Sequence, residues 1–188
     1  MPVGFLTQEQ RDGFGRYGEA PSREELERYF YLSDEDREAI QTLRGDHTRL
    51  GYAILLTTVR YLGVLPDQPT AVPAEVKEVL CRQLVIPDPD CLQRYSDHRR
   101  WIHAADIQKR YGYRHFTDPG IGFRLGRWLY ALCWTGTDRP GVLFERAASW
   151  LLTHKVLLPG VSQLERFIAQ LRSRVEERLW STLDRSVT

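Results

Sequence analysis

The chain has 188 residues, of which 42 % are hydrophobic and 27 % charged, a composition typical of a globular protein with its own core. No apolar run approaches the roughly 20 residues that a membrane-crossing helix needs, and the first residues, MPVGFLTQEQRD, lack the pattern of an export signal. Three cysteines without a CxxC spacing argue against a disulfide framework and against a thiolate zinc site. We therefore expect a protein of the reducing cytoplasm.

Charge is distributed unevenly along the chain. Residues 1–90 hold ten basic and sixteen acidic residues, a net charge of −6, whereas residues 91–188 hold sixteen and nine, a net charge of +7. Such an asymmetry predicts a half that faces a polyanion, joined to a half that neutralises it. The alternative is two solvated surfaces that differ in sign.

Helical periodicity begins with two capping signals. Ser22 followed by Glu25, and Ser33 followed by Asp36, form the spacing of a capping box. The second box opens a short helix that stops near Gly45, and another helix is predicted from about 48 to 62. Two helices joined by a short glycine-containing turn indicate a helix-turn-helix unit, although helical hairpins that bind nothing share this pattern.

A proline-rich connector at 66–73 separates this unit from a predicted helix at 74–85. The stretch PDPD at 87–90 ends that helix where the charge also changes sign. The sequence therefore predicts two helical modules, residues 1–86 and residues 87–188. Within the second module we expect helices at about 90–101, 103–111, 121–134 and 141–154.

The last element carries the clearest periodicity. Ser162 is expected to cap it with Glu165 at the third position, and a helix over 162–184 would be about 34 Å long. Its apolar stripe consists of Leu164, Phe167, Ile168, Leu171, Val175 and Leu179. Only a short extended piece at 156–158 departs from the helical pattern, so the predicted fold class is all-α.

A catalytic function has little support in the sequence. The chain contains no P-loop, GxGxxG, GxSxG or HExxH motif. His98 and His103 would face directions about 140° apart on one helix, so these two would not share a metal ion. A site that also uses His115 is conceivable, and the alternative is histidines that are satisfied within the protein or face solvent. The acidic residues of the first half gather at helix starts, where they complement the helix dipole. We expect no catalytic site, no metal and no cofactor.

The first candidate binding segment interleaves cations with aromatic rings over residues 99–116. Cations neutralise phosphates, and arginine also bonds to guanine edges in the major groove. The alternative is that Trp101, Ile102, Ala105 and Ile107 form core and the cations line a wet face. The candidate contacts are Arg99, Arg100, Lys109, Arg110, Tyr113 and Arg114.

The second candidate lies at residues 155–167, where a turn between two predicted helices makes another helix-turn-helix-like unit. The N-terminal residues of a recognition helix reach base edges, and free N–H groups there can bind phosphate. The candidate contacts are Ser162, Gln163, Arg166 and Gln170. The alternative is an ordinary turn with Glu165 and Arg166 on the surface.

The third candidate precedes the apolar helix at 48–62, inside the acidic half. Its candidate phosphate or base contacts are Arg44, His47, Thr48 and Arg49. Solvated residues at a helix start are the alternative.

At these stretches the chain resembles the N-terminal region of the replicative transposases of the Tn-three family, from about residue 6 to residue 183. The matching phrases are LSDEDRE at 32–38, RGDHTRLGYAILL at 44–56, RYGYRHFTDP at 110–119, KVLLPGVSQLERF at 155–167 and EERLW at 176–180. The resemblance implies a bipartite, all-helical region with two centromere-protein-B-like helix-turn-helix modules. In the family this region recognises the terminal inverted repeats of the transposon.

The resemblance also implies that the DDE residues that use magnesium for strand transfer lie in a later, RNase-H-like domain of the transposase. The expected function is therefore sequence-specific binding of double-stranded DNA at transposon ends, without catalysis, in the cytoplasm of a bacterium and associated with its nucleoid. The expected partner is duplex DNA rather than a membrane, with self-association through the rest of the transposase. The alternative is a helical protein-interaction, assembly or regulatory domain. No base-contact motif of the family transfers residue by residue.

Overall fold

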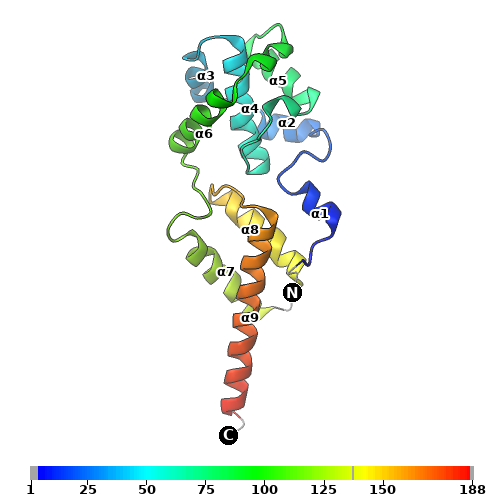
Figure 1. Cartoon of the computed structure of the whole chain (residues 1–188), viewed down its shortest axis with the longest axis vertical. Coiled ribbons are helices and arrows are strands. Elements are labelled where there is room, and N and C mark those ends of the chain that lie inside the picture. The colour runs from blue at the N-terminus through cyan, green and yellow to red at the C-terminus, as the bar shows by residue number, and fades with distance from the viewer. Residues whose placement is uncertain (1–3, 137, 187–188) are drawn as a thin grey trace. The chain divides into compact units, whose positions relative to one another are not determined.

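The computed structural model, which describes residues 4–136 and 138–186, confirms the all-α fold class (Figure 1). No strand forms among these residues, and one isolated parallel bridge joins Arg114 to Val156, the first residue of the predicted extended piece. None of the described helices has the length and apolar content needed to cross a membrane. In chain order the helices are α1 (Gln8–Gly13), α2 (Arg23–Tyr29), α3 (Asp34–Gln41), α4 (Asp46–Leu62), the 3-10 turn η1 (Pro69–Ala71), α5 (Ala74–Leu84), the 3-10 turn η2 (Pro89–Arg94), α6 (Asp97–Tyr111), α7 (Ile121–Thr135), α8 (Pro140–Thr153) and α9 (Val161–Ser186).

The chain divides into two compact units. Residues 15–113 form the first, which we name the central unit. Residues 114–188 together with the first 14 residues form the other, the terminal unit. The chain passes from one unit to the other after Tyr113, whereas the change in composition suggests a boundary after Ile86. The difference arises because α6 packs on α4 and so belongs with the first half of the chain.

Helix α4 is the core of the central unit. Residues 50–59 are all buried, because this stretch is apolar around its whole circumference and must be covered on every side. Helices α2, α3, α5 and α6 and both 3-10 turns pack against it. A β-carbon at Gly51 would lie 2.5 Å from the ring of Tyr95, so the glycine permits this close approach. Partly exposed residues of α4 are confined to its two ends, 46–49 and 60–62.

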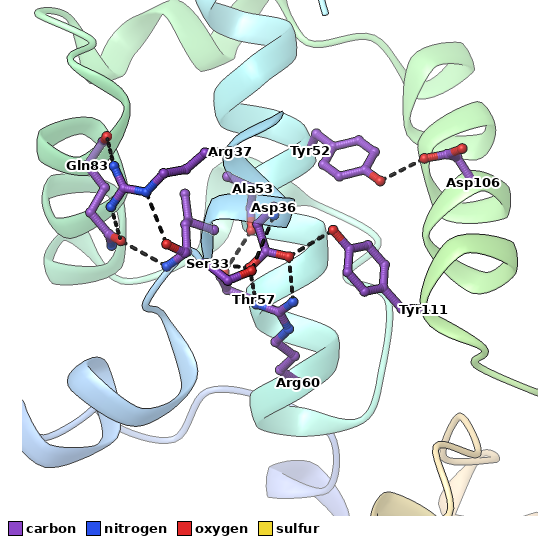
Figure 2. Close-up of polar contacts among 11 residues, drawn as sticks. Ser33, Asp36, Arg37, Tyr52, Ala53, Thr57, Arg60, Gln83, Asp106 and Tyr111 are labelled. Carbon is purple, nitrogen blue, oxygen red and sulfur yellow. Dashed lines mark hydrogen bonds and ion pairs between the residues drawn. The ribbon is translucent and has the colours of Figure 1, made fainter. Parts of the chain in front are cut away.

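Both predicted capping boxes are present, at Ser22 with Glu25 and at Ser33 with Asp36. Asp36 has a second role, because its carboxylate is buried and accepts two hydrogen bonds from Arg60, at 2.9 and 2.7 Å, and one from the Tyr111 hydroxyl at 2.8 Å (Figure 2). Burial alone would raise the pKa of Asp36, but the hydrogen bonds from Arg60, Tyr111 and the Ser33 backbone N–H outweigh it and lower the pKa to about 2. These contacts connect α3, α4 and the end of α6.

The prediction of separate helices at 90–101 and 103–111 is wrong. A single helix, α6, begins after Ser96, whose hydroxyl accepts the N–H of Arg99 at 3.4 Å, and ends at Gly112. The chain before it forms η2, because Pro87 and Pro89 oppose a regular helix there. Since the cations of α6 lie in the central unit, that unit holds 14 basic and 16 acidic residues and the terminal unit 12 and 9. The net charges are therefore −2 and +3, a smaller contrast than the two halves of the sequence suggest.

The terminal unit packs α7, α8 and α9 around one apolar core. From the stripe of α9, Leu164, Ile168 and Val175 are buried, and Phe167 and Leu171 pack partly buried against the core. The side chain of Leu179 lies outside the described part of the chain. The segment of α1 also belongs here, since Phe5 before this helix and Phe14 after it both contact Phe144 edge to face.

The predicted cap of α9 is wrong. The helix begins one residue earlier, at Val161, and the carbonyl of Gly160 accepts the first N–H bonds. Glu165 is neither a cap nor a surface residue: it is 2 % exposed, lies 2.6 Å from Arg11 and accepts the backbone N–H groups of Phe5 and Leu6 at 3.3 Å. The N-terminal segment therefore supplies the donors that make this buried carboxylate tolerable.

Candidate nucleic-acid interface

The first turn of α4 brings part of the third candidate segment to the surface. Gly45, at φ 85°, caps this helix without a side-chain hydrogen bond. Arg44 is exposed and His47 half-buried. Arg49 donates to the carbonyl of Leu43 at 3.1 Å and lies 3.7 Å from Asp46, so part of its bonding capacity is used within the protein. Thr48 is only 1 % exposed, which places its side chain too deep for the DNA contact that the sequence suggests.

The start of α6 lies beside this turn. The pKa of His47 is lowered, first by burial and then by the positive charges of Arg94 and Arg99. Two segments that are about 50 residues apart in the sequence therefore meet at His47, Arg94 and Arg99, with Asp46 as the nearby acid. We name these residues, together with the exposed Arg44 that precedes α4, the α4/α6 surface. Sequence reasoning missed Arg94. It lies within the helix predicted at 90–101 but before the candidate segment 99–116, and the structure places it at the end of the 3-10 turn η2.

Helix α6 separates the candidates of the first segment. Arg99, Lys109 and Arg110 are exposed, and Arg110 pairs with Asp106 at 3.4 Å. The side chain of Arg100 is 14 % exposed and lies 3.6 Å from both Asp67 and Asp97, so the structure does not support a phosphate contact from Arg100.

The other two candidates of that segment lie beyond α6. Tyr113 is half-buried, and its pKa is raised, chiefly by burial. Arg114 belongs to the terminal unit and donates to the carbonyl of Pro119 at 3.3 Å. The candidates within residues 99–114 therefore belong to two different units.

Helix α6 also contradicts the interpretation of its apolar residues as core. Of the four, only Ile107 is buried, whereas Trp101, Ile102 and Ala105 are exposed. The side that packs on α4 carries His103, Ala104 and Ile107 instead.

The first turns of α9 display all four candidates of the second segment. Ser162, Gln163, Arg166 and Gln170 are exposed, and Arg166 donates to the Ser162 carbonyl at 3.2 Å. Because Glu165 points inward, its charge does not oppose an anion on this side of the helix. Gln163, Arg166 and Gln170 lie at i, i+3 and i+7, so they share one helical face.

A groove of about 850 Å³ runs between α7 and α9 and includes Gln170. Its other lining side chains include Phe123, Arg127, Tyr130 and Arg174. We name this the α7/α9 groove. Sequence reasoning missed Arg127 and Arg174. The signal for Arg127 was the helical period: with Ile121, Leu125 and Leu129 facing the core, positions 123, 127 and 130 lie on the opposite side.

The histidines do not gather into a metal site. His98 is exposed, whereas His103 is buried and its Nδ1 lies 2.7 Å from the Tyr95 hydroxyl. Burial, and then the charge of Arg99, lower the pKa of His103. The described residues contain no group of three or more histidine, cysteine or carboxylate side chains placed to hold a metal ion.

Comparison with known proteins identifies the family. Residues 5–171 match the family described as Domain of unknown function (DUF4158). The transposase for transposon gamma-delta of Escherichia coli K12 is 42 % identical over 185 residues, which cover 97 % of this chain and 18 % of that protein. The transposases for Tn501 of Pseudomonas aeruginosa and Tn1546 of Enterococcus faecium are 29 % and 28 % identical, over 89 % and 98 % of this chain and 17 % and 18 % of their own lengths. The chain thus spans less than a fifth of each relative, and it belongs to the DUF4158 family, which forms the N-terminal region of transposases of the Tn-three family.

Proposed function

We propose that this chain binds double-stranded DNA, recognises the terminal inverted repeats of a transposon, and contributes binding rather than catalysis to transposition. The observation that carries the proposal is that each unit has an exposed cationic surface: the α4/α6 surface in the central unit and the α7/α9 groove with the first turns of α9 in the terminal unit. The relatives that match this chain are all transposases by name, and a transposase acts on DNA.

The chemistry of the two surfaces differs in a way that suits sequence recognition. Cations on both surfaces neutralise phosphates and release counterions whatever the sequence. Gln163 and Gln170 add amide groups, each of which can form two hydrogen bonds with one adenine. Arg166 adds a guanidinium, which can form two hydrogen bonds with one guanine. We assign base contacts in the terminal unit to these three residues and phosphate contacts to Arg127 and Arg174.

Helix-turn-helix geometry supports the proposal unequally in the two units. In the terminal unit, α8, the turn at 154–160 and α9 leave one face of the first two turns of α9 exposed, as a recognition helix requires. In the central unit, α4 is buried along residues 50–59, so it cannot lie in a groove. DNA contacts there come from the first turn of α4 and from α6.

The test is selection of bound duplexes from a random library with the full chain. We expect one sequence to be enriched, to match a terminal inverted repeat, and to bind more tightly than its scrambled version at about 0.15 M salt. The logarithm of the affinity should fall linearly with the logarithm of the salt concentration. Equal binding of enriched and scrambled duplexes would overturn sequence recognition.

Absence of catalysis has its own test. Supercoiled DNA incubated with the full chain and magnesium should stay intact. Nicking that disappears when a particular carboxylate is replaced would contradict this part of the proposal.

A protein-interaction function is the second candidate, and exposed aromatic side chains favour it. Trp101, Phe123 and Trp180 are all largely exposed, and aromatic residues are enriched in protein interfaces. If this function holds instead, DNA binding will be weak and independent of sequence, and these three residues will govern self-association measured by sedimentation.

A further inference from the structure

We infer that α6 is the helix of the central unit that reads base pairs, and that its exposed apolar face contacts thymine methyl groups in the major groove. The inference rests on the proposed function and deepens it, because it names the helix, the residues and the chemical group that they recognise. In the central unit, the helix-turn-helix pattern of the sequence directs attention to α4, which is buried.

The apolar face is continuous along the exposed side of α6. Trp101 is 67 % exposed and Ile102 54 % exposed, and Ala105 is also exposed. These positions follow the spacing of three and four residues that places side chains on one helical face. Covering a large, solvent-exposed apolar side chain with another apolar group removes its surface from water, which is favourable.

The rotation of α6 about its own axis is determined by contacts on its opposite side. His103 bonds to Tyr95, Asp106 accepts the Tyr52 hydroxyl at 2.7 Å, and Tyr111 donates to Asp36 at 2.8 Å, the last two as drawn in Figure 2. Ile107 is fully buried between them. Turning Trp101 and Ile102 inward would break these three hydrogen bonds, so the apolar face is presented outward by the fold itself.

Cations lie at both ends of this face. Arg99 stands before Trp101, and Lys109 and Arg110 stand after Ala105. Arg99 and Lys109 are ten residues apart, which is about 15 Å along a helix, close to the roughly 12 Å width of the major groove. The two acids of α6 itself are already engaged, since Asp97 faces Arg100 and Asp106 faces Arg110 and Tyr52.

This distribution favours DNA over a protein as the occupant of the face. Arg99, Lys109 and Arg110 border two large apolar side chains, and cations in these places complement the phosphates of a duplex. In the major groove the C5-methyl group of thymine is the apolar feature of a base pair, and phosphates border it on both sides.

The experiment uses the full chain and the duplex enriched from the random library. Each thymine of that duplex is replaced in turn by deoxyuridine, which lacks only the C5-methyl group. We expect one or two positions to weaken binding about fourfold each, the factor for one buried methyl group. Ile102→Ala or Trp101→Ala should weaken binding of the unmodified duplex and abolish the deoxyuridine effect at one of these positions.

Tyr31→Ala is the matched control, because Tyr31 is also a large exposed side chain of the central unit, 60 % exposed. It should keep the full deoxyuridine effect, and all three variants should keep the thermal unfolding midpoint. The inference is overturned if no thymine is sensitive, if Ile102→Ala and Trp101→Ala leave every deoxyuridine effect unchanged, or if they alter the sedimentation of the free chain. In each of these cases the enriched sequence still supports the proposed function. Failure to enrich any sequence would instead defeat the proposed function itself.

Discussion

The central and terminal units are both helical and both expose cations, but their cores are built differently. The central unit is net acidic and surrounds a helix that is buried along ten consecutive residues, with the carboxylate of Asp36 buried against Arg60. The terminal unit is net basic and packs three helices around an apolar core, with Glu165 buried against Arg11. Each unit nevertheless presents its own exposed cations. The comparison teaches that the net charge of a unit does not reveal where its exposed cations gather.

The largest expected effect is on the stability of the central unit. Asp36→Ala should lower the free energy of unfolding by about 3 kcal/mol, because Arg60 and the Tyr111 hydroxyl lose the acceptor they share in the interior. Chemical denaturation followed by tryptophan fluorescence measures the change. Asp34→Ala is the control, since Asp34 is exposed on the same helix and should change stability by less than about 0.5 kcal/mol. Equal losses in the two variants would contradict the role of Asp36.

The pH dependence of stability should differ between the unmodified chain and the Asp36→Ala variant. A pKa lowered to about 2 in the folded state means that Asp36 stabilises the fold fully above the unfolded pKa near 4 and loses this contribution as the pH falls toward 2. We expect about 2 kcal/mol of stability to be lost across that interval beyond the loss seen in Asp36→Ala. If the free energy of unfolding of the unmodified chain and that of Asp36→Ala change in parallel with pH, Asp36 is not the titrating group.

A smaller loss of stability is expected in the terminal unit. Glu165→Ala removes the acceptor for Arg11 and for the backbone N–H groups of Phe5 and Leu6, and should cost about 2 kcal/mol. Hydrogen exchange should accelerate at the amides of Phe5 and Leu6. Glu145→Ala on the exposed side of α8 is the control. Unchanged exchange at these two amides would show that Glu165 does not hold the N-terminal segment.

The smallest expected effect concerns DNA affinity. Arg127→Ala and Arg174→Ala should each weaken binding about fivefold for every sequence and reduce the magnitude of the salt slope by about 0.9, the value for one lost phosphate contact. Arg23→Ala is the matched control, because Arg23 is an exposed cation outside both surfaces and is paired with Glu27. An equal effect of all three substitutions would mean that only total charge matters and that the α7/α9 groove has no special role.

Several features of the fold were predictable because their causes are local. The capping boxes at Ser22 and Ser33 join residues three apart, and the ends of α4 and α6 at Gly63 and Gly112 follow from glycine after a helical period. The positions of Ser162, Gln163, Arg166 and Gln170 on an exposed face were predictable for the same reason, since one helical period describes them all. Whether they contact DNA is a separate prediction that the experiments above address.

Other features depended on residues that are distant in the sequence. Thr48 and Glu165 resemble surface residues in their local context, yet both are buried, Thr48 within the central unit and Glu165 against Arg11, 154 positions away. Arg100 stands in a basic run, yet it faces Asp67 as well as its neighbour Asp97. Periodicity could not identify these partners, because it describes which side chains share a face and not what that face meets.

From the sequence alone follow the all-α class, most helix limits and the supply of cations, since helix hydrogen bonds, caps and side-chain periodicity act within a few residues of one another. Tertiary structure alone decides that α6 joins α4, that α4 is interior, and which way Trp101 and Ile102 face. Those outcomes depend on burial and on hydrogen bonds such as Tyr111 to Asp36, between residues 75 positions apart, and such contacts form only when the whole unit closes around its core.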